Sequence, residues 1–369
     1  MKRLRPTTVL IATVAALALF AAACGDSKDD TSKESTTTAT AKAADAPTDA
    51  QIQALTAKAA GGGASFPDAF YQAVNTDFNG VAGKELVTYA KSGSSDGRKQ
   101  LADQTLQFAG SDSLPKPEET FKGGEILFFP TVAAPITVSY NVSGLTELQL
   151  SPDTLAGIMS TDIKVWNDPK IAADNPDATL PSTPIVVVHR SDGSGTTNNF
   201  TKYLVAAAPN TWKLGSGDTV AWPAGTQGAE KNSGVAQLIK QTNGAVGYVD
   251  LADSQKAGLS VAAIKDQTGE FVKPTAAGVT AALESAEVAD NLTYNPLNSK
   301  GKGAYPITAP TWLLTYTKYT DAALVSTLQT YLRYVLTTGQ EQAQKLGYVA
   351  IPESLQTQAL AQVDKITAG

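Results

Sequence analysis

A run of small polar residues around one arginine has the clearest chemical potential in this sequence. The run HRSDGSGTTNNF, residues 189–200, follows consecutive valines that predict a buried strand. Arg190 offers a planar set of N–H donors that fits two oxygens of one anion. The Gly-Ser-Gly-Thr turn opens a predicted helix at residues 196–207, whose first N–H groups and positive dipole end favour an anion. An oxyanion site is one interpretation, and a capped helix with Arg190 in a surface ion pair is the other.

Three further turns of small residues lie at strand ends and support the first interpretation. They are GGGASFP at residues 61–67, KSGSSDG at residues 91–97 and GSDS at residues 110–113. In an open α/β sheet, ligands bind beyond the carboxyl ends of the strands. We therefore expect the four turns to converge on one cleft.

A serine hydrolase is a rival interpretation of the same turns. Ser95 lies in a G-x-S-x-G pattern, and Ser95, Asp112 and His189 follow the chain order of an α/β-hydrolase triad. His189, however, directly precedes Arg190, and alternation along a strand turns neighbouring side chains to opposite faces. The ring of His189 should therefore point away from the guanidinium, which disfavours the hydrolase. No G-x-x-x-x-G-K-[ST] pattern occurs, which argues against a P-loop nucleotide site.

Composition narrows the classes of function further. The chain has 369 residues, enough for two domains, with 42% hydrophobic residues and a formal net charge of −6. An acidic chain disfavours nucleic acid and anionic membrane as partners. With one histidine and one cysteine, the chain forms no internal disulfide and no zinc or copper site of nitrogen and sulfur ligands, so we expect no cofactor.

The N-terminal segment predicts export and attachment to a membrane. Positive residues at the start are followed by an apolar stretch at residues 9–20 and by small residues before Cys24. This pattern is similar to a bacterial lipoprotein signal, with a signal peptide at residues 1–23 and a lipidated Cys24. Its removal would shift the net charge from −6 to −9. Residues 24–60 are rich in Ser, Thr and Ala and predict a flexible tether.

Short strands alternate with helices after residue 61. Strands are expected at residues 86–89, 106–109 and 245–249, and helices at residues 98–105, after Ser151-Pro152, at 235–241 and at 320–339. Such alternation predicts an α/β fold with mostly parallel strands.

Seven motifs in a fixed order give the chain a resemblance to a known family. They are GASFP at 63–67, GSS at 93–95, Ser111-Asp112, FPTV at 129–132, RSDGSGT at 190–196, GAVGYV at 244–249 and YPIT at 305–308. In these motifs the chain resembles the phosphate-binding proteins of bacterial ABC phosphate transporters. The R-x-D-G-S-G-T run followed by G-A-V-G-Y is the specific part of the match.

The resemblance implies a periplasmic-binding-protein-like α/β clamp of two lobes, each a mixed sheet flanked by helices, joined by a two-strand hinge. Lobe I would comprise residues 61–133 and 306–369, and lobe II residues 134–305, with crossings near 132–136 and 306–310. The implied function is capture of inorganic phosphate and delivery to an ABC permease, by a monomer that is not an enzyme. A binder of another tetrahedral oxyanion, such as sulfate or molybdate, is the nearer alternative, and a phosphoester hydrolase using Ser95 is the more remote one.

The resemblance also implies a set of ligand residues. The phosphate ligands carried over from the family are Ser65, Phe66, Ser94, Asp112, Arg190, Ser194, Gly195 and Thr196. Asp192 matches the aspartate that holds the arginine. Asp112 would discriminate between anions, because a carboxylate accepts the proton that phosphate retains and repels sulfate, which has none.

Three positions depart from the family pattern. Ser65 stands where threonine is common and keeps the hydroxyl. Asp96 adds a negative charge near the expected site and puts the geometry of that turn in question. His189 precedes the arginine, and we expect a structural role for it.

Overall fold

The structure is a computed structural model, and it describes residues 45–369. The expected signal peptide, Cys24 and the tether up to residue 44 lie outside the described residues. Within residues 45–369, none of the helices is both long and apolar enough to cross a membrane.

The folded part of the chain begins earlier than the sequence indicates. Helix α2 (Asp49–Gln53) is capped by Thr48, and Ile52 and Leu55 are buried in the hydrophobic core. Strand β1 (Ala59–Gly63) follows directly. The prediction of a tether is therefore wrong for residues 49–60, because two apolar side chains suffice to anchor this short segment.

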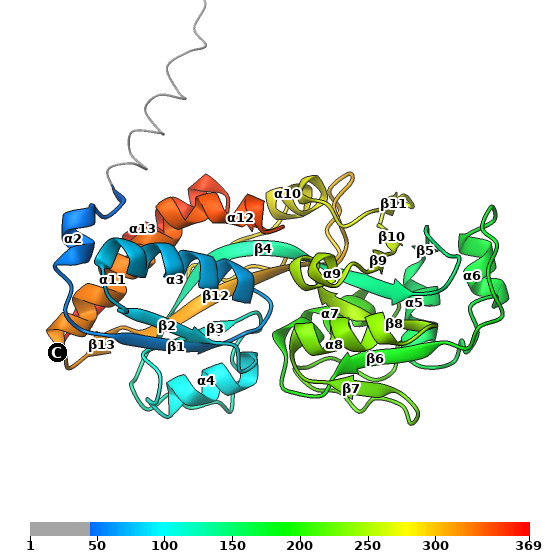
Figure 1. The fold of residues 1–369 in the computed structure, drawn as a ribbon, viewed down its shortest axis with the longest axis horizontal. Helices are drawn as coiled ribbons and strands as arrows, with labels where there is room; N and C mark the ends of the chain where they lie inside the picture. The colour runs from blue at the N-terminus through cyan, green and yellow to red at the C-terminus, as the bar shows by residue number, and fades with distance from the viewer. Residues whose placement is uncertain (1–44) are drawn as a thin grey trace, which may run out of the picture. The chain divides into compact units, whose positions relative to one another are not determined.

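One mixed sheet runs through both lobes in the order β2-β1-β3-β12-β4-β8-β6-β7 (Figure 1). We call lobe I the part built on β1, β2, β3, β12 and β4 up to Pro135, and lobe II the part built on β6, β7, β8 and β4 from Ile136. The remaining strands of this sheet are β2 (Val87–Ala90), β3 (Phe108–Ser111), β4 (Ile126–Asn141), β6 (Val186–Arg190), β7 (Gln227–Ala229), β8 (Ala245–Asp250), β9 (Ser260–Val261), β12 (Thr308–Tyr316) and β14 (Val349–Ala350). The two-lobed α/β fold is confirmed.

The long strand β4 connects the two lobes. Its first part pairs antiparallel with β12 as far as Pro135, and from Ile136 onward it pairs antiparallel with β8. All its residues except the two ends are buried. The expectation of mostly parallel strands is therefore wrong for the centre of the sheet, where β4 and β12 run against their neighbours, and right for β1–β3 and β6–β8.

Helices cover the faces of the sheet in both lobes (Figure 1). Those packed mainly in lobe I are α2, α3 (Asp68–Ala82), α4 (Ser94–Ala102), α11 (Ala322–Leu336), α12 (Glu341–Lys345) and α13 (Glu353–Val363). Those of lobe II are α5 (Pro152–Met159), α6 (Pro169–Asp174), α7 (Gly195–Ala207), α8 (Lys231–Gln241) and α9 (Leu251–Ala257). Helix α10 (Ala276–Glu284) contacts β4 and β14.

The smaller elements lie outside the main sheet. The short strands β5 (Gln149–Leu150), β10 (Ala263–Lys265) and β11 (Phe271–Val272) form a three-stranded sheet, and β13 (Lys318–Tyr319) pairs with β15 (Thr367–Ala368). A 3₁₀ turn spans Thr338–Gln340.

Local sequence signals explain the helices that matter for the site. The side chain of Ser194 caps α7 by accepting a hydrogen bond from the N–H of Thr197. Asp321 caps α11 in the same way, as its sequence suggests. Helix α4 starts at Ser94 rather than near residue 98, because Gly93 adopts a positive φ of 103° and turns the chain from the β2 end into the helix.

Candidate functional site

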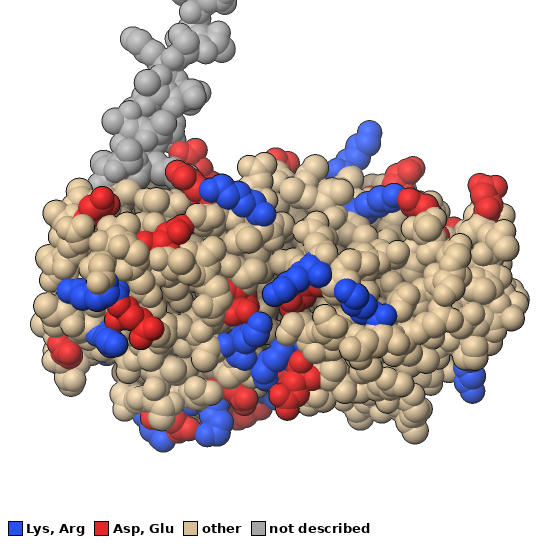
Figure 2. Space-filling view, viewed as in Figure 1, with Lys and Arg blue, Asp and Glu red and all other residues tan. Residues whose placement is uncertain are grey.

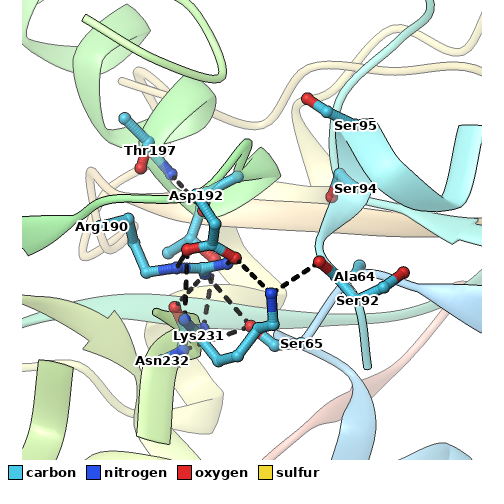
Figure 3. A network of polar contacts seen from close by, with 12 residues as sticks. Ala64, Ser65, Ser92, Ser94, Ser95, Arg190, Asp192, Thr197, Lys231 and Asn232 are labelled. Carbon is cyan, nitrogen blue, oxygen red and sulfur yellow. Dashed lines mark hydrogen bonds and ion pairs between the residues drawn. The ribbon is translucent and has the colours of Figure 1, made fainter. Parts of the chain in front are cut away.

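Arg190 lies at the end of β6 and is buried between the lobes (Figure 3). Its Nε and Nη2 donate to the two carboxylate oxygens of Asp192 at 2.7 and 2.6 Å. Its Nη1 donates to Ser65 Oγ of lobe I at 3.1 Å and to Asn232 Oδ1 at 2.8 Å. The bidentate contact fixes the plane of the guanidinium, as the resemblance implies for Asp192.

The carboxylate of Asp192 is shared with a lysine. Lys231 Nζ donates to Asp192 Oδ2 at 2.9 Å and to the carbonyl oxygen of Ser92 in lobe I at 2.7 Å. Burial opposes ionisation of Asp192, but the contacts with Arg190 and Lys231 outweigh it and hold the pKa of this carboxyl well below its usual range. The group of two cations and one anion therefore keeps a positive charge.

Hydrogen bonds from lobe II orient two hydroxyl groups as donors. Ser65 Oγ accepts from Arg190 and from the N–H of Asn232, and Thr196 Oγ1 accepts from Asn232 Nδ2 at 3.2 Å. A hydroxyl that already accepts has its O–H left to give. Both side chains are buried, so each has an O–H group that can donate in poorly solvated surroundings.

The start of α7 meets lobe I at very short range. A Cβ atom added to Gly195 would lie 2.5 Å from Ser94 Oγ and 2.9 Å from Asp112 Oδ2, so only glycine fits this approach. The first N–H groups of a helix have no partners within the helix. Those of Gly195 and Thr196 therefore lie where Ser94 and Asp112 of the other lobe converge.

Asp112 is the buried carboxylate of the site. Its Oδ1 accepts from Thr311 Oγ1 at 2.7 Å, and its Oδ2 accepts from Ser94 Oγ at 3.3 Å. Burial raises the pKa of Asp112 to about 7, against the opposing effects of Thr311, Arg190 and Ser94. Asp112 therefore exchanges a proton near neutral pH.

A second contact between the lobes lies beside the first. Arg98 on α4 is 1% exposed and donates through Nε and Nη2 to both carboxylate oxygens of Glu119 at 2.8 Å. Its Nη2 also pairs with Asp218 Oδ2 of lobe II at 2.6 Å, and the same oxygen accepts from Ser95 Oγ at 2.8 Å. Burial opposes ionisation of Asp218, but Arg98 outweighs it and lowers the pKa of this carboxyl. These contacts join the lobes through a neutralised arginine.

Charged side chains of both signs gather along the middle of one face of the molecule, between α4 and α8 (Figure 2). The surface there does not form a patch of one sign. The charges seen on this face therefore give no field of one sign there.

The three residues of the possible hydrolase triad have separate partners. Ser95 bonds Asp218, Asp112 bonds Thr311 and Ser94, and His189 stacks on Trp222 with ring centroids 4.7 Å apart. The ring nitrogens of His189 contact Thr226 Oγ1 and the carbonyl oxygen of Arg190. No nucleophile–base pair joins these three residues, which disfavours the hydrolase.

Comparison with known proteins identifies the family. The domain described as a PBP superfamily domain matches residues 32–338. The phosphate-binding protein PstS of Xylella fastidiosa is 34% identical over 309 residues, which cover 82% of this chain and 84% of the relative. The phosphate-binding protein PstS 2 of Mycobacterium tuberculosis is 32% identical over 296 residues, covering 76% and 79%. This chain belongs to the PstS phosphate-binding protein family.

The family membership confirms the resemblance seen in the sequence. A solved structure of a high-affinity periplasmic phosphate-binding protein bound with phosphate has the same fold. It has a TM-score of 0.69 and 25% identity, and the match covers 83% of this chain and 93% of that one. A phosphate-binding protein from Stenotrophomonas maltophilia shares the fold at 20% identity, with a TM-score of 0.66 and coverage of 83% and 94%.

The structure brings most of the predicted ligand residues of this PstS-family chain together. Ser65, Ser94, Asp112, Arg190, Ser194, Gly195 and Thr196 lie in the contact between the lobes, and their role as ligands stays a prediction. The ring of Phe66 points into the core, which leaves its main-chain amide for the site. Asp96, by contrast, is exposed on α4.

Several residues of the site were not foreseen. Lys231 and Asn232 open α8, which the apolar pattern placed near residue 235, and Lys231 has a positive φ of 61° that no sequence pattern indicates. Asp218 and Thr311 come from a loop and from a strand with no motif of their own. The polar run Lys-Asn-Ser-Gly, which forms the first turn of the helix, is the one signal that could have drawn attention to Asn232.

Metal chemistry has no support in the described part of the chain. Within residues 45–369, no group of three or more His, Cys, Asp or Glu side chains is placed to hold a metal ion.

Proposed function

We propose that this protein captures inorganic phosphate between its two lobes and delivers it to the permease of an ABC transporter. The observation that carries the proposal is the combination of oriented donors with one acceptor. Ser65 and Thr196 present O–H groups beside Arg190, and Asp112 presents a carboxylate oxygen from the facing side. A monoprotonated phosphate needs several donors for its bare oxygens and one acceptor for its own proton.

The raised pKa of Asp112 supports this assignment. At a pKa of about 7, one proton is readily shared between the carboxyl and a phosphate oxygen. Sulfate carries no proton above neutral pH, where Asp112 is ionised. The two negative groups would then meet across a buried contact, which is unfavourable by several kcal/mol.

Contacts from both lobes supply the reason for closure. A phosphate held by Arg190 and Thr196 of lobe II and by Ser65 of lobe I would stabilise the closed arrangement relative to an open one. The closed arrangement would be the form that the permease recognises. We further propose that the chain crosses between the lobes within residues 132–136 and 306–310.

The remaining parts of the proposal concern location and class. We propose that the protein is a binding protein rather than an enzyme, acts as a monomer and is held outside the cell membrane by a lipid on Cys24. The signal-like residues 1–23 support the anchor. Mass spectrometry of the membrane-extracted protein would show a diacylglycerol on Cys24, and a Cys24→Ser variant would lose it and leave the membrane fraction.

Calorimetric titration of the purified protein with phosphate and with sulfate at pH 8 tests the central claim. We expect tight phosphate binding and sulfate binding at least about 100-fold weaker, because the ionised Asp112 repels the bare sulfate oxygen. Equal affinity for both anions would favour a general oxyanion binder. Absence of phosphate binding would overturn the proposal.

A further inference from the structure

A β-bulge interrupts the pairing of the two central strands next to the site. Thr311 of β12 opposes Val132 of β4, whereas the next residue, Trp312, opposes Pro130. Thr131 is therefore the extra residue on β4. A bulge of this kind re-aims side chains and is common beside functional sites.

The bulge places the hydroxyl of Thr311 against Asp112. Thr311 is fully buried, and its Oγ1 donates to Asp112 Oδ1 at 2.7 Å. The extra residue, Thr131, turns its own hydroxyl to Tyr71 Oη at 2.9 Å, while its carbonyl oxygen accepts from Gln340 Nε2 at 3.0 Å. Thr311 Oγ1 also lies 3.5 Å from the carbonyl oxygen of Ser111, and Thr131 Oγ1 lies 3.5 Å from the carbonyl oxygen of Thr311. The contact with Asp112 is thus the shortest hydrogen bond of the Thr311 hydroxyl.

The two oxygens of Asp112 consequently have different surroundings. Oδ1 is held from behind by the central strand β12, and Oδ2 lies beside Ser94 and within reach of a Cβ built on Gly195 of lobe II. A carboxyl group without the Thr311 contact would rotate about its terminal torsion, which has broad minima. Thr311 removes that freedom.

We propose that Thr311 is a positioning residue for anion selection, because its hydroxyl holds Oδ1 of Asp112 and thereby turns Oδ2 toward the proton of the bound phosphate. The inference rests on the proposed phosphate function and extends it to a residue that does not touch the ligand. Threonine suits the role, since its β-branch restricts χ1 and fixes the direction of the hydroxyl.

The charge on Asp112 also depends on this contact. The groups that act on the carboxyl are Thr311 from β12, Ser94 from α4 and Arg190 from β6, which favour the ionised form, and Asp218 from the lobe II loop, which opposes it. Loss of the Thr311 donor would therefore move the titration of Asp112 to higher pH. At a fixed pH near neutrality, less of the carboxyl would be ionised to reject sulfate.

The experiment compares Thr311→Val with Thr311→Ser and with a matched control. Valine keeps the shape of threonine and removes the donor, whereas serine keeps the donor. Thr315→Val is the control, because Thr315 lies on the same strand, is equally buried, and its Oγ1 has no hydrogen-bond partner among the described residues. Phosphate and sulfate affinities are measured by calorimetry from pH 5.5 to 8.5, and thermal unfolding verifies that each variant is folded.

We expect Thr311→Val to lower the phosphate-to-sulfate affinity ratio at pH 8 by about 10- to 100-fold, the effect of one lost hydrogen bond to a charged group. The pH at which the ratio changes should also move upward. Thr311→Ser should stay within about threefold of the parent, and Thr315→Val should equal it. An unchanged ratio and pH profile in Thr311→Val, or equal damage in Thr311→Ser, would overturn the inference while leaving the phosphate function intact.

A direct measurement separates this inference from the proposed function. The carboxyl carbon of Asp112 can be followed by NMR as pH is varied in the protein without ligand, in the parent and in Thr311→Val. An upward shift of its midpoint in the variant is expected, and identical midpoints would contradict the role of Thr311. A parent protein that binds no phosphate would overturn the function and the selection role together.

Discussion

Each lobe contributes one buried arginine to the contact between the lobes, and the two arginines meet different groups. Arg98 of lobe I is held by both oxygens of Glu119, and Arg190 of lobe II is held in the same bidentate way by Asp192. Across the contact, Arg98 reaches a second carboxylate, Asp218, whereas Arg190 reaches the neutral hydroxyl of Ser65.

The two arginine contacts differ in their net charge. Arg98 with its two carboxylates has a net charge of −1, whereas Arg190 with Asp192 and Lys231 has a net charge of +1. One arginine is therefore neutralised inside the contact, and the other can still stabilise an anion. Similar geometry joins the lobes at Arg98 and, under the proposed function, binds the anion at Arg190.

Replacement of Arg190, the arginine whose charge is not neutralised, should have the largest effect on phosphate affinity. Arg190→Gln removes the cation and the donors on which Ser65 and Asp192 depend. We expect phosphate affinity to fall by about 100- to 1000-fold, as for loss of one partner from a buried charge contact. Calorimetry measures the change, and Arg333→Gln, an arginine of lobe I that pairs with Asp364, is the control. A loss below about tenfold would show that Arg190 does not carry the charge of the site.

The next largest effect is expected at Asp112, because both carboxylates of the Arg98 contact pair with the arginine, whereas Asp112 is bonded by hydroxyl groups. Asp112→Asn replaces the carboxylate with an amide that donates as well as accepts. At pH 8 we expect the phosphate-to-sulfate affinity ratio to fall by about 100-fold, mainly through stronger sulfate binding. Calorimetric titrations of the variant with phosphate and with sulfate give this affinity ratio. An unchanged ratio would remove Asp112 from the discrimination.

The pH dependence of the parent protein follows from the same carboxyl. With a pKa of about 7, Asp112 is ionised above neutrality and rejects sulfate, and below neutrality it is protonated and can donate to a sulfate oxygen. Discrimination should therefore weaken as pH falls from 8.5 to 5.5. In Asp112→Asn the ratio should be nearly flat over this range.

The contact between Arg98 and Asp218 should affect the affinity for anions without affecting the phosphate-to-sulfate affinity ratio. Asp218→Asn leaves Arg98 with Glu119 but removes the charge pair between the lobes. A less populated closed arrangement lowers the apparent affinity for every anion by the same factor, here about tenfold. Calorimetry and the radius of gyration from small-angle scattering measure both effects. Asp103→Asn is the control, because Asp103 is a half-buried carboxylate that pairs with Lys99 and Lys122 within lobe I. A changed phosphate-to-sulfate ratio in Asp218→Asn would contradict the division of roles.

The two arginines also show what the sequence can predict. The segment around Arg190 has a strand, a glycine-rich turn and a helix within residues 186–207, so local rules and family motifs point to it. Arg98 sits in an ordinary amphipathic helix, and its partner Asp218 is 120 residues away in a loop. No local sequence pattern predicts the contact between Arg98 and Asp218, because only tertiary folding brings the two residues together.

The errors in the fold have similar physical causes. Alternation of strands and helices correctly predicts parallel pairing at β1–β3 and β6–β8, but the antiparallel pairing of β4 with β12 joins segments nearly 180 residues apart. The predicted tether is too long because residues 49–60 carry only two large apolar side chains. Burial of Ile52 and Leu55 depends on the hydrophobic core of lobe I, where α2 contacts α3 and α11.

The smallest effect is expected at His189, which directly precedes Arg190 but lies outside both arginine contacts. Its ring stacks on Trp222 and bonds Thr226, and burial lowers its pKa, so it stays neutral at neutral pH. His189→Ala should change phosphate affinity by no more than about twofold and lower stability by about 1 kcal/mol through the lost stacking. The change in Trp222 packing should appear in tryptophan fluorescence. Phosphoester hydrolysis by the parent that disappears in His189→Ala would favour the hydrolase interpretation instead.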